Sequence, residues 1–400
     1  MNVRRRSLSI GPMLLLGGLG ACSASGPPAT TNAGAAGAAG APGVAPAATV
    51  APADDYAALL APYRRVPMHS DLAGLSTRER ALLAKLSEAT IRLDELFWEQ
   101  TDPDGLALYR RLESSTAERD QQLRRLLRIN GGRYDLIREH APFAGAGPRP
   151  PGANLYPADL TRVEIEAYVA RHPDEKAALY DPYTVVRRQG DRLVAVPYHI
   201  AYARWLEPIV QLLRDAVTLS DDPAFARFLR MRADALQDDN YFASDLAWLD
   251  LKRPKFDVIF APYETYEDNL LGVKATYGAA VLIRNESESR KLEVFQKYVS
   301  DIQNALPLPA ADRPSMRGLA TPMEVMDAPI RGGDLRHGYQ AVADNLPNDA
   351  RVHEQKGTKK IFFLNFLVAR TQNVVLPIAA RLLDAPRRRA TPRPRATPAS

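Results

Sequence analysis

Apolar residues recur at helical spacing in the first third of the chain. The stretch Ser76-Thr77-Arg78-Glu79 is a capping box, in which the serine and glutamate side chains satisfy free N–H groups at a helix start. Six apolar positions follow it on one helical face: Leu82, Leu83, Leu86, Leu93, Leu96 and Phe97. The pattern predicts a helix over about residues 77–99.

A second capping box, Ser115-Thr116-Ala117-Glu118, precedes another run of leucines at helical spacing. The stretch Asn130-Gly131-Gly132 follows the last leucine, and glycine is common just past a helix end. We therefore expect a helix that begins at this box and ends at the glycines. Similar periodicity predicts three more helices, at about residues 158–171, 199–217 and 223–236.

Strand signals lie between and after these helices. Two β-branched runs flank Gln189-Gly190-Asp191 and predict a hairpin with a short turn. The runs FDVIFAPYETYED and YGAAVLIRN predict strands of a buried sheet. Helices and strands do not alternate regularly, so we expect an α+β fold that is mostly helical with a mixed β core.

Residues 361–383 are apolar enough to suggest a membrane span. Charged and amide side chains interrupt the segment, among them Arg370 and Arg381, and they would be costly in a bilayer. We therefore expect a buried strand followed by a buried helix.

The two ends of the chain differ in composition from the middle. Residues 1–22 carry three arginines, a short apolar run and the only cysteine, Cys22. The ending Leu-Gly-Ala-Cys resembles a bacterial lipobox, which predicts a lipoprotein signal peptide with lipid on Cys22; an ordinary signal cut near Ala21 is the alternative. Residues 23–53 carry no charge and predict a disordered Ala/Gly/Pro linker.

These segments predict a location in the bacterial cell envelope, with the protein tethered to a membrane on its periplasmic or extracellular face. The net charge of +5 comes largely from residues 385–400, an Arg/Pro tail predicted to be disordered. The region between, residues 54–384, is close to neutral and indicates no nucleic-acid partner.

The fragment His353-Glu354 is the one local hint of metal chemistry. A zinc-protease helix needs two histidines four residues apart, and position 357 is glycine. The residues Lys356-Gly357-Thr358-Lys359-Lys360 predict a turn rather than a helix, and we interpret RVHEQKGTKK as a solvated loop. No other histidine spacing, nucleophile elbow or phosphate loop is present in the sequence.

Acidic residues cluster around aromatic ones in two stretches, DDNYFASDLAWLDL and YETYEDN. Such acids could serve in acid–base chemistry, but they more often cap helices or bind backbone N–H groups. The acids concerned are Asp238, Asp239, Asp245, Asp250, Glu264, Glu267 and Asp268.

Four longer stretches carry a family resemblance. LDELFWEQ, GPRPPGANLYP, the segment from DLAWLDL to YGAAVLI, and DNLPND resemble, in this order, the bacterial branch of the dipeptidyl-peptidase III family. The resemblance runs from about residue 70 to 383. It implies part of a two-lobed zinc exopeptidase that releases dipeptides from the amino termini of oligopeptides.

The resemblance also implies a site. Glu264, Asn345 and Asn348 would hold the free amino group of the peptide, because an ammonium ion needs carboxylate and carbonyl acceptors. The catalytic residue would be Tyr266, whose hydroxyl would stabilise the oxyanion. The alternative for Tyr266 is a packed strand residue.

The sequence departs from the family at its zinc site. The family motif His-Glu-x-x-Gly-His does not occur, so we expect no metal in this chain, a region truncated before the zinc-binding part, and no peptide hydrolysis. The tail composition favours a frameshift or premature stop. A non-catalytic, membrane-tethered binder of peptide amino termini is the second hypothesis, and a structural envelope lipoprotein is the third.

Overall fold

The computed structural model describes residues 55–309, 323–337 and 341–388. They lie within one unit, Ala51–Ser400. The predicted signal peptide with Cys22, the linker 23–53 and most of the Arg/Pro tail lie outside the described residues. The helix α15 includes residues 385–388, so the first part of the predicted disordered tail is helical.

The long helix α2 (Thr77–Thr101) confirms the first prediction and its capping box. The Glu79 N–H donates to Ser76 Oγ (3.1 Å), and the Ser76 N–H donates to Glu79 Oε2 (2.8 Å). The helix packs its apolar face against the central sheet and against α8. Because its core leucines are almost fully buried, this helix is the support on which the sheet rests.

The second predicted helix is present, but its capping box is not. Helix α4 (Glu118–Asn130) starts after Ala117, and Ser115 Oγ donates to the carboxylate of Asp120 instead of capping the helix. Gly131 ends the helix with φ 65°, as expected. The other elements of this part are α1 (Tyr56–Leu60), α3 (Pro103–Arg111), β1 (Tyr134–Asp135) and β2 (Ala141–Pro142).

The middle of the chain follows the predicted pattern closely. The hairpin consists of β3 (Thr184–Gln189) and β4 (Arg192–Pro197) with the turn Gly190-Asp191 between them. Thr161 caps α5, so this helix begins later than predicted. The helices here are α5 (Arg162–Arg171), α6 (Lys176–Leu179), α7 (Tyr198–Ala201), α8 (Ala203–Leu219), α9 (Pro223–Asp238) and α10 (Phe242–Leu249), with short 3₁₀ turns η1 (Ala153–Leu155) and η2 (Pro173–Glu175).

The central sheet has five strands in the order β5-β6-β7-β9-β8. The pair β7/β9 is parallel and the other three pairs are antiparallel, so the sheet is mixed. The strands are β5 (Phe256–Glu264), β6 (Thr276–Arg284), β7 (Met323–Gly333), β8 (Ala343–Leu346) and β9 (Lys359–Phe363). Strands β5 and β6 are buried along nearly their whole length, as their continuous apolar runs predict.

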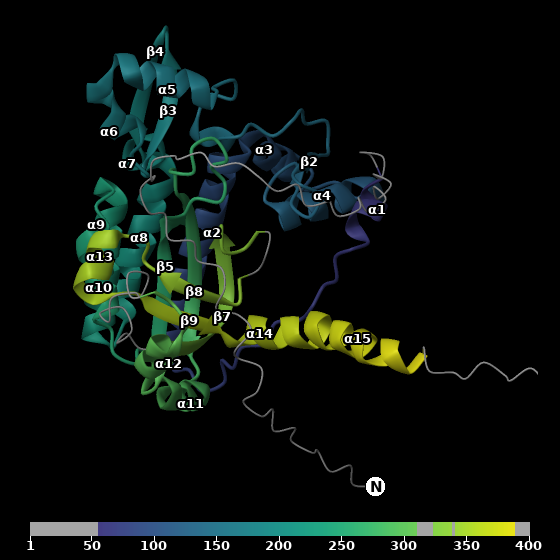
Figure 1. Ribbon diagram of the computed structural model, residues 1–400, viewed down its shortest axis with the longest axis vertical. Coiled ribbons are helices and arrows are strands. Elements are labelled where there is room, and N and C mark those ends of the chain that lie inside the picture. The colour runs from purple at the N-terminus through teal and green to yellow at the C-terminus, as the bar shows by residue number, and fades with distance from the viewer. Residues whose placement is uncertain (1–54, 310–322, 338–340, 389–400) are drawn as a thin grey trace, which may run out of the picture. The chain divides into compact units, whose positions relative to one another are not determined.

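In the apolar segment 361–383, the predicted buried strand is confirmed and the predicted buried helix is not. Its strand part lies in β9 and is largely buried, but the helical part is exposed: in the stretch Leu364–Leu383, which is long and apolar enough to cross a membrane, none of the apolar window is buried. The first turns contact β7 and β9, and the rest extends away from the sheet (Figure 1). The helical elements are α14 (Leu364–Arg370), the π-helical η5 (Thr371–Val375) and α15 (Leu376–Arg388).

Two further helices, α11 (Glu286–Gln296) and α12 (Val299–Ala305), follow β6. Helix α11 packs on β7. The remaining helix, α13 (Ala350–Lys356), contacts α10.

Candidate functional site

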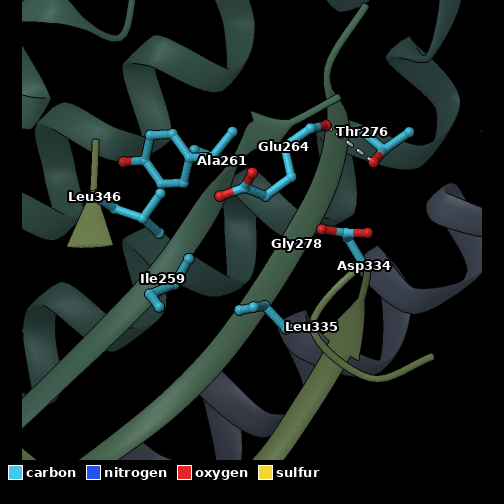
Figure 2. A pocket seen from close by; sticks show the side chains of 9 residues that line it. Ile259, Ala261, Glu264, Thr276, Gly278, Asp334, Leu335 and Leu346 are labelled. Carbon is cyan, nitrogen blue, oxygen red and sulfur yellow. Dashed lines mark hydrogen bonds between the residues drawn. The ribbon is translucent and has the colours of Figure 1, made fainter. Parts of the chain in front are cut away.

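A β-bulge at the end of β5 brings Glu264 to a small pocket. The register between β5 and β6 shifts between Pro262 and Glu264. Regular alternation along a strand would place Glu264 on the face opposite to Ala261, but the extra residue restores it to the same face. Glu264 therefore lines a pocket together with Ala261, Thr276 and Leu346 (Figure 2).

A buried polar network fixes the bulged residue, Tyr263. Its hydroxyl donates to Asp245 Oδ1 (2.7 Å) and accepts from Arg232 Nη1 (3.1 Å). Arg232 and Asp245 also form an ion pair, with side chains 1% and 3% exposed. Because a charge buried this deeply must keep its partner, the network holds the bulge, and hence Glu264, in one position. Asp245, a candidate acid in the sequence, is thus a structural residue.

Asn348 lies beside Glu264, as the sequence predicts. Its Nδ2 donates to the backbone oxygen of Tyr263 (2.9 Å) and to Glu264 Oε1 (3.3 Å). Burial raises the pKa of Glu264 above its usual value, and hydrogen bonds from Asn348 and Tyr266 counteract part of this shift. No lysine, arginine or histidine among the described residues forms an ion pair with Glu264. This carboxylate is therefore available to an external cation.

Tyr266 lies in the loop that follows β5. Its side chain is 71% exposed, which excludes the alternative of a packed strand residue. Its hydrogen bond to the Glu264 side chain brings both predicted residues together. The role of Tyr266 as a catalytic group stays a prediction.

Asn345 lies on β8 one residue before Leu346. Successive side chains of a strand point to opposite faces, so Asn345 faces away from the pocket that Leu346 lines. Its Oδ1 accepts a hydrogen bond from Thr358 Oγ1 (2.5 Å). The structure therefore brings Glu264, Tyr266 and Asn348 together without Asn345, and its predicted role in substrate binding stays a prediction.

Two acids that the sequence analysis did not single out add negative charge here. Asp334 lines the pocket just after β7, and Asp344 lies on β8 (Figure 2 for Asp334). Burial, with the carboxylates of Glu267, Glu264 and Asp344, raises the pKa of Asp334 well above its usual value. Burial likewise raises the pKa of Asp344 to about 7, against the opposing effect of Arg331. In the sequence, the one signal for Asp334 is the pair Gly332-Gly333 directly before it, because two glycines indicate an unusual backbone conformation.

Most of the clustered acids bind backbone groups or basic side chains, as expected. Asp239 accepts from the His199 N–H (3.0 Å), and Asp268 accepts four backbone N–H groups of its own loop. Asp250 pairs with Lys356, and Asp238 accepts from the Asn240 N–H. Glu264 differs from them, because it lines a pocket and no basic side chain in the described part of the chain pairs with it.

The His353-Glu354 stretch is helical, so its interpretation as a solvated loop was wrong. Residues 350–356 form α13, because Asp349 caps the helix start and Gly357 ends it. His353 Nε2 lies 2.5 Å from the backbone oxygen of Pro347, which engages this imidazole within the protein. Among the described residues no three His, Cys, Asp or Glu side chains are grouped so that they could hold a metal ion.

Solved structures of similar chains share this fold. DPP III from Caldithrix abyssi matches with a TM-score of 0.76 and 35% identity, over 81% of this chain and 62% of that chain. Dipeptidyl-peptidase III from Corallococcus sp. strain EGB matches with a TM-score of 0.76 and 33% identity, over 82% of this chain and 62% of that one. Nudix hydrolase 3 of Arabidopsis thaliana is 26% identical over 372 residues, 80% of this chain and 48% of that protein. No family model matches the chain.

The fold class is α+β, with a mixed sheet whose β5 end carries the pocket. The two structures confirm the dipeptidyl-peptidase III resemblance. The chain spans about half the length of the curated relative and less than two thirds of each solved chain.

Proposed function

We propose that the pocket beside Glu264 binds the free amino terminus of an oligopeptide. The carrying observation is a carboxylate that lines a pocket, is held by Asn348 and has no described cationic partner. A peptide ammonium group would supply that positive charge. It would donate to Glu264 and to Asn348 Oδ1, which accepts no hydrogen bond from a described residue. The names of the two solved relatives, dipeptidyl-peptidases, support a peptide as the ligand.

Tyr266 would supply the second contact. Its exposed hydroxyl group donates to Glu264 in the protein without peptide, and a peptide ammonium group that donates to Glu264 would take over this contact. The single O–H of Tyr266 would then turn and donate to a carbonyl oxygen of the same peptide. In a zinc peptidase the same donor would stabilise an oxyanion. Here it would add affinity and orientation.

Hydrolysis does not follow from these residues. The family implies zinc, which polarises the scissile carbonyl and activates water. The described residues do not fit a zinc ion, since they assemble no group of metal-binding side chains. We therefore propose binding of peptide amino termini without hydrolysis by this chain. The match to Nudix hydrolase 3 covers 48% of that protein, and we propose no Nudix activity for this chain.

Calorimetry with tetra-alanine tests the binding. We expect the free peptide to bind and the N-acetylated peptide to bind at least about tenfold more weakly, because acetylation removes the positive charge. Equal affinity for the two peptides would refute recognition of the amino group.

The proposed inactivity has its own test. The purified chain is assayed for bound zinc and for release of arylamine from a dipeptidyl-arylamide. We expect neither stoichiometric zinc nor turnover. Zinc at one equivalent together with turnover would overturn this part of the proposal and leave the binding site intact.

We also propose that Cys22 anchors the protein to the cell envelope through lipid. The support is the sequence of residues 1–22 alone. The full chain expressed in a bacterium should carry a lipid on Cys22, detected as an added mass on the amino-terminal peptide, and Cys22→Ser should carry none. A wild-type chain without this added mass would contradict the anchor.

A further inference from the structure

The stretch GPRPPGANLYP has no role in the site described so far. We call residues 147–157 the clamp loop and residues 265–275, which connect β5 to β6 and include Tyr266, the Tyr266 loop. Several residues of the clamp loop contact the Tyr266 loop. The strongest contact joins Arg149 to Glu267, the residue after Tyr266.

Arg149 makes two contacts with Glu267. Its Nη2 donates to the Glu267 carboxylate and to the Glu267 backbone oxygen (3.4 Å). The two side chains are only 7% and 15% exposed, so water screens their attraction weakly. The other terminal nitrogen, Nη1, is buried and has no hydrogen-bond partner among the residues that the structure describes. Glu267 therefore provides the charge compensation for this guanidinium, and the pair fixes the backbone next to Tyr266.

Two more contacts extend the attachment along the loop. The Asn269 N–H donates to the backbone oxygen of Pro151 (2.8 Å). The buried Tyr156 hydroxyl donates to Asp268 Oδ2 (2.9 Å). Burial, with the charge of Asp268 and this hydrogen bond, raises the pKa of Tyr156, so the phenol stays a donor.

The shape of the clamp loop suits this role. At Gly152 a Cβ atom would lie 2.3 Å from Cδ2 of Tyr156, so only glycine lets this ring take its place. Asn154 Nδ2 donates to the backbone oxygen of Glu99 (2.7 Å), in the last turn of α2. The clamp loop thus connects α2, which packs on the central sheet, to the Tyr266 loop.

We propose that Arg149 is a positioning residue, which holds Glu267 and thereby sets Tyr266 and Glu264 for the incoming peptide amine. This rests on the proposed function for its effect on binding, but not for its effect on the loop. Arg149 touches no reacting atom in this account. Its removal should loosen the Tyr266 loop and weaken the peptide without removing any ligand-binding group.

The test compares Arg149→Met with Arg188→Met in the full chain. Arg188, in β3, also forms ion pairs, in its case with Asp159 and Glu164, but it lies on the surface of the hairpin and is therefore the control. We expect Arg149→Met to speed amide hydrogen exchange in residues 268–274 by roughly tenfold and to weaken tetra-alanine binding by roughly tenfold. Both follow from the loss of a hydrogen-bonded charge pair. Arg188→Met should change neither, and Arg149→Lys should recover part of both.

The double variant Arg149→Met/Glu267→Gln separates position from charge. A positioning role predicts the same losses as in the single variant, because the attachment is still missing. Recovery of affinity and exchange in the double variant would overturn the proposal, since an unpaired Glu267 would then explain the loss. Unchanged exchange in Arg149→Met would overturn it as well.

The test also covers a variant that does not fold and a wild-type chain that does not bind the peptide. If Arg149→Met does not fold, Glu267→Gln, which keeps the backbone acceptor, carries the same comparison against Arg188→Met. If the wild-type chain binds no tetra-alanine but Arg149→Met still loosens residues 268–274, the proposed function fails and the attachment of the loop by Arg149 stands.

Discussion

The Tyr266 loop and the C-terminal helix differ in what holds them. The loop buries Leu270 in the core, and its polar groups are hydrogen-bonded as well: Asp268 accepts backbone N–H groups of the loop, and Glu267 accepts from Arg149 of the clamp loop. The helical segment 364–383 is apolar, satisfies its own backbone, and leaves Leu382 and Leu383 67% and 74% exposed. The Tyr266 loop is thus held by buried apolar and hydrogen-bonded polar groups together. The C-terminal helix packs on the sheet only through its first turns, and its later described residues leave their apolar side chains exposed.

Asp268→Ala should have the largest effect on this contrast. The change leaves four backbone N–H groups and the Tyr156 hydroxyl without their acceptor inside the protein. We expect the free energy of unfolding to fall by about 3–4 kcal/mol in chemical denaturation. Asp250→Ala, which removes an exposed partner of Lys356, should cost less than about 1 kcal/mol. Equal losses would show that the loop is not held through Asp268.

Leucine truncation tests the other region. Leu213→Ala in α8, where the side chain is fully buried, should cost about 2–5 kcal/mol because it leaves a cavity. Leu383→Ala removes the same atoms from an exposed position and should change stability by less than about 0.5 kcal/mol. A loss of several kcal/mol on Leu383→Ala would mean that a partner covers the helix in solution.

The affinity for the peptide should change with pH as the carboxyl groups near the pocket ionise. Glu264 must be ionised to hold an ammonium group, and its pKa is raised, so affinity should be lost as pH falls through a value above the usual one for glutamate. Ionisation of Asp344 as pH rises through about 7 adds nearby negative charge and should strengthen binding further. Calorimetry of tetra-alanine between pH 5 and pH 8 checks both. Affinity that rises toward low pH would contradict the assignment.

The smallest expected effect distinguishes the two asparagines. Asn348→Ala removes a group that contacts Glu264 and should weaken the peptide by roughly tenfold. Asn345→Ala changes a side chain on the other face of β8 and should weaken it less than about threefold. Equal losses would confirm the role that the sequence predicts for Asn345.

The sequence predicted the regular elements well where local signals and burial agree. Helix α2 has both its capping box and its apolar face, and β5 and β6 are continuous apolar runs. It also predicted Glu264 and Asn348, residues more than eighty positions apart that the sheet brings into hydrogen-bond contact. Family resemblance carried that pairing, since no local pattern links the two.

The failures have physical causes that local patterns do not contain. The Ser115 box was lost to a competing hydrogen bond with Asp120. Asp349 caps the start of a helix, although the glycine and lysines that follow it suggested a turn. The bulge at Tyr263, the acids Asp334 and Asp344, and the exposed face of the C-terminal helix depend on how distant segments meet.

One measurement tests the central claim most directly: a double-difference cycle between Glu264 and the peptide amino group. Calorimetry gives the affinities of the wild type and Glu264→Gln for tetra-alanine and for its N-acetylated form. We predict that Glu264→Gln weakens the free peptide by about 1.5–3 kcal/mol and leaves the acetylated peptide nearly unchanged, because only the free amine donates a charged hydrogen bond. The same loss for both peptides would contradict an amino-terminus site at Glu264.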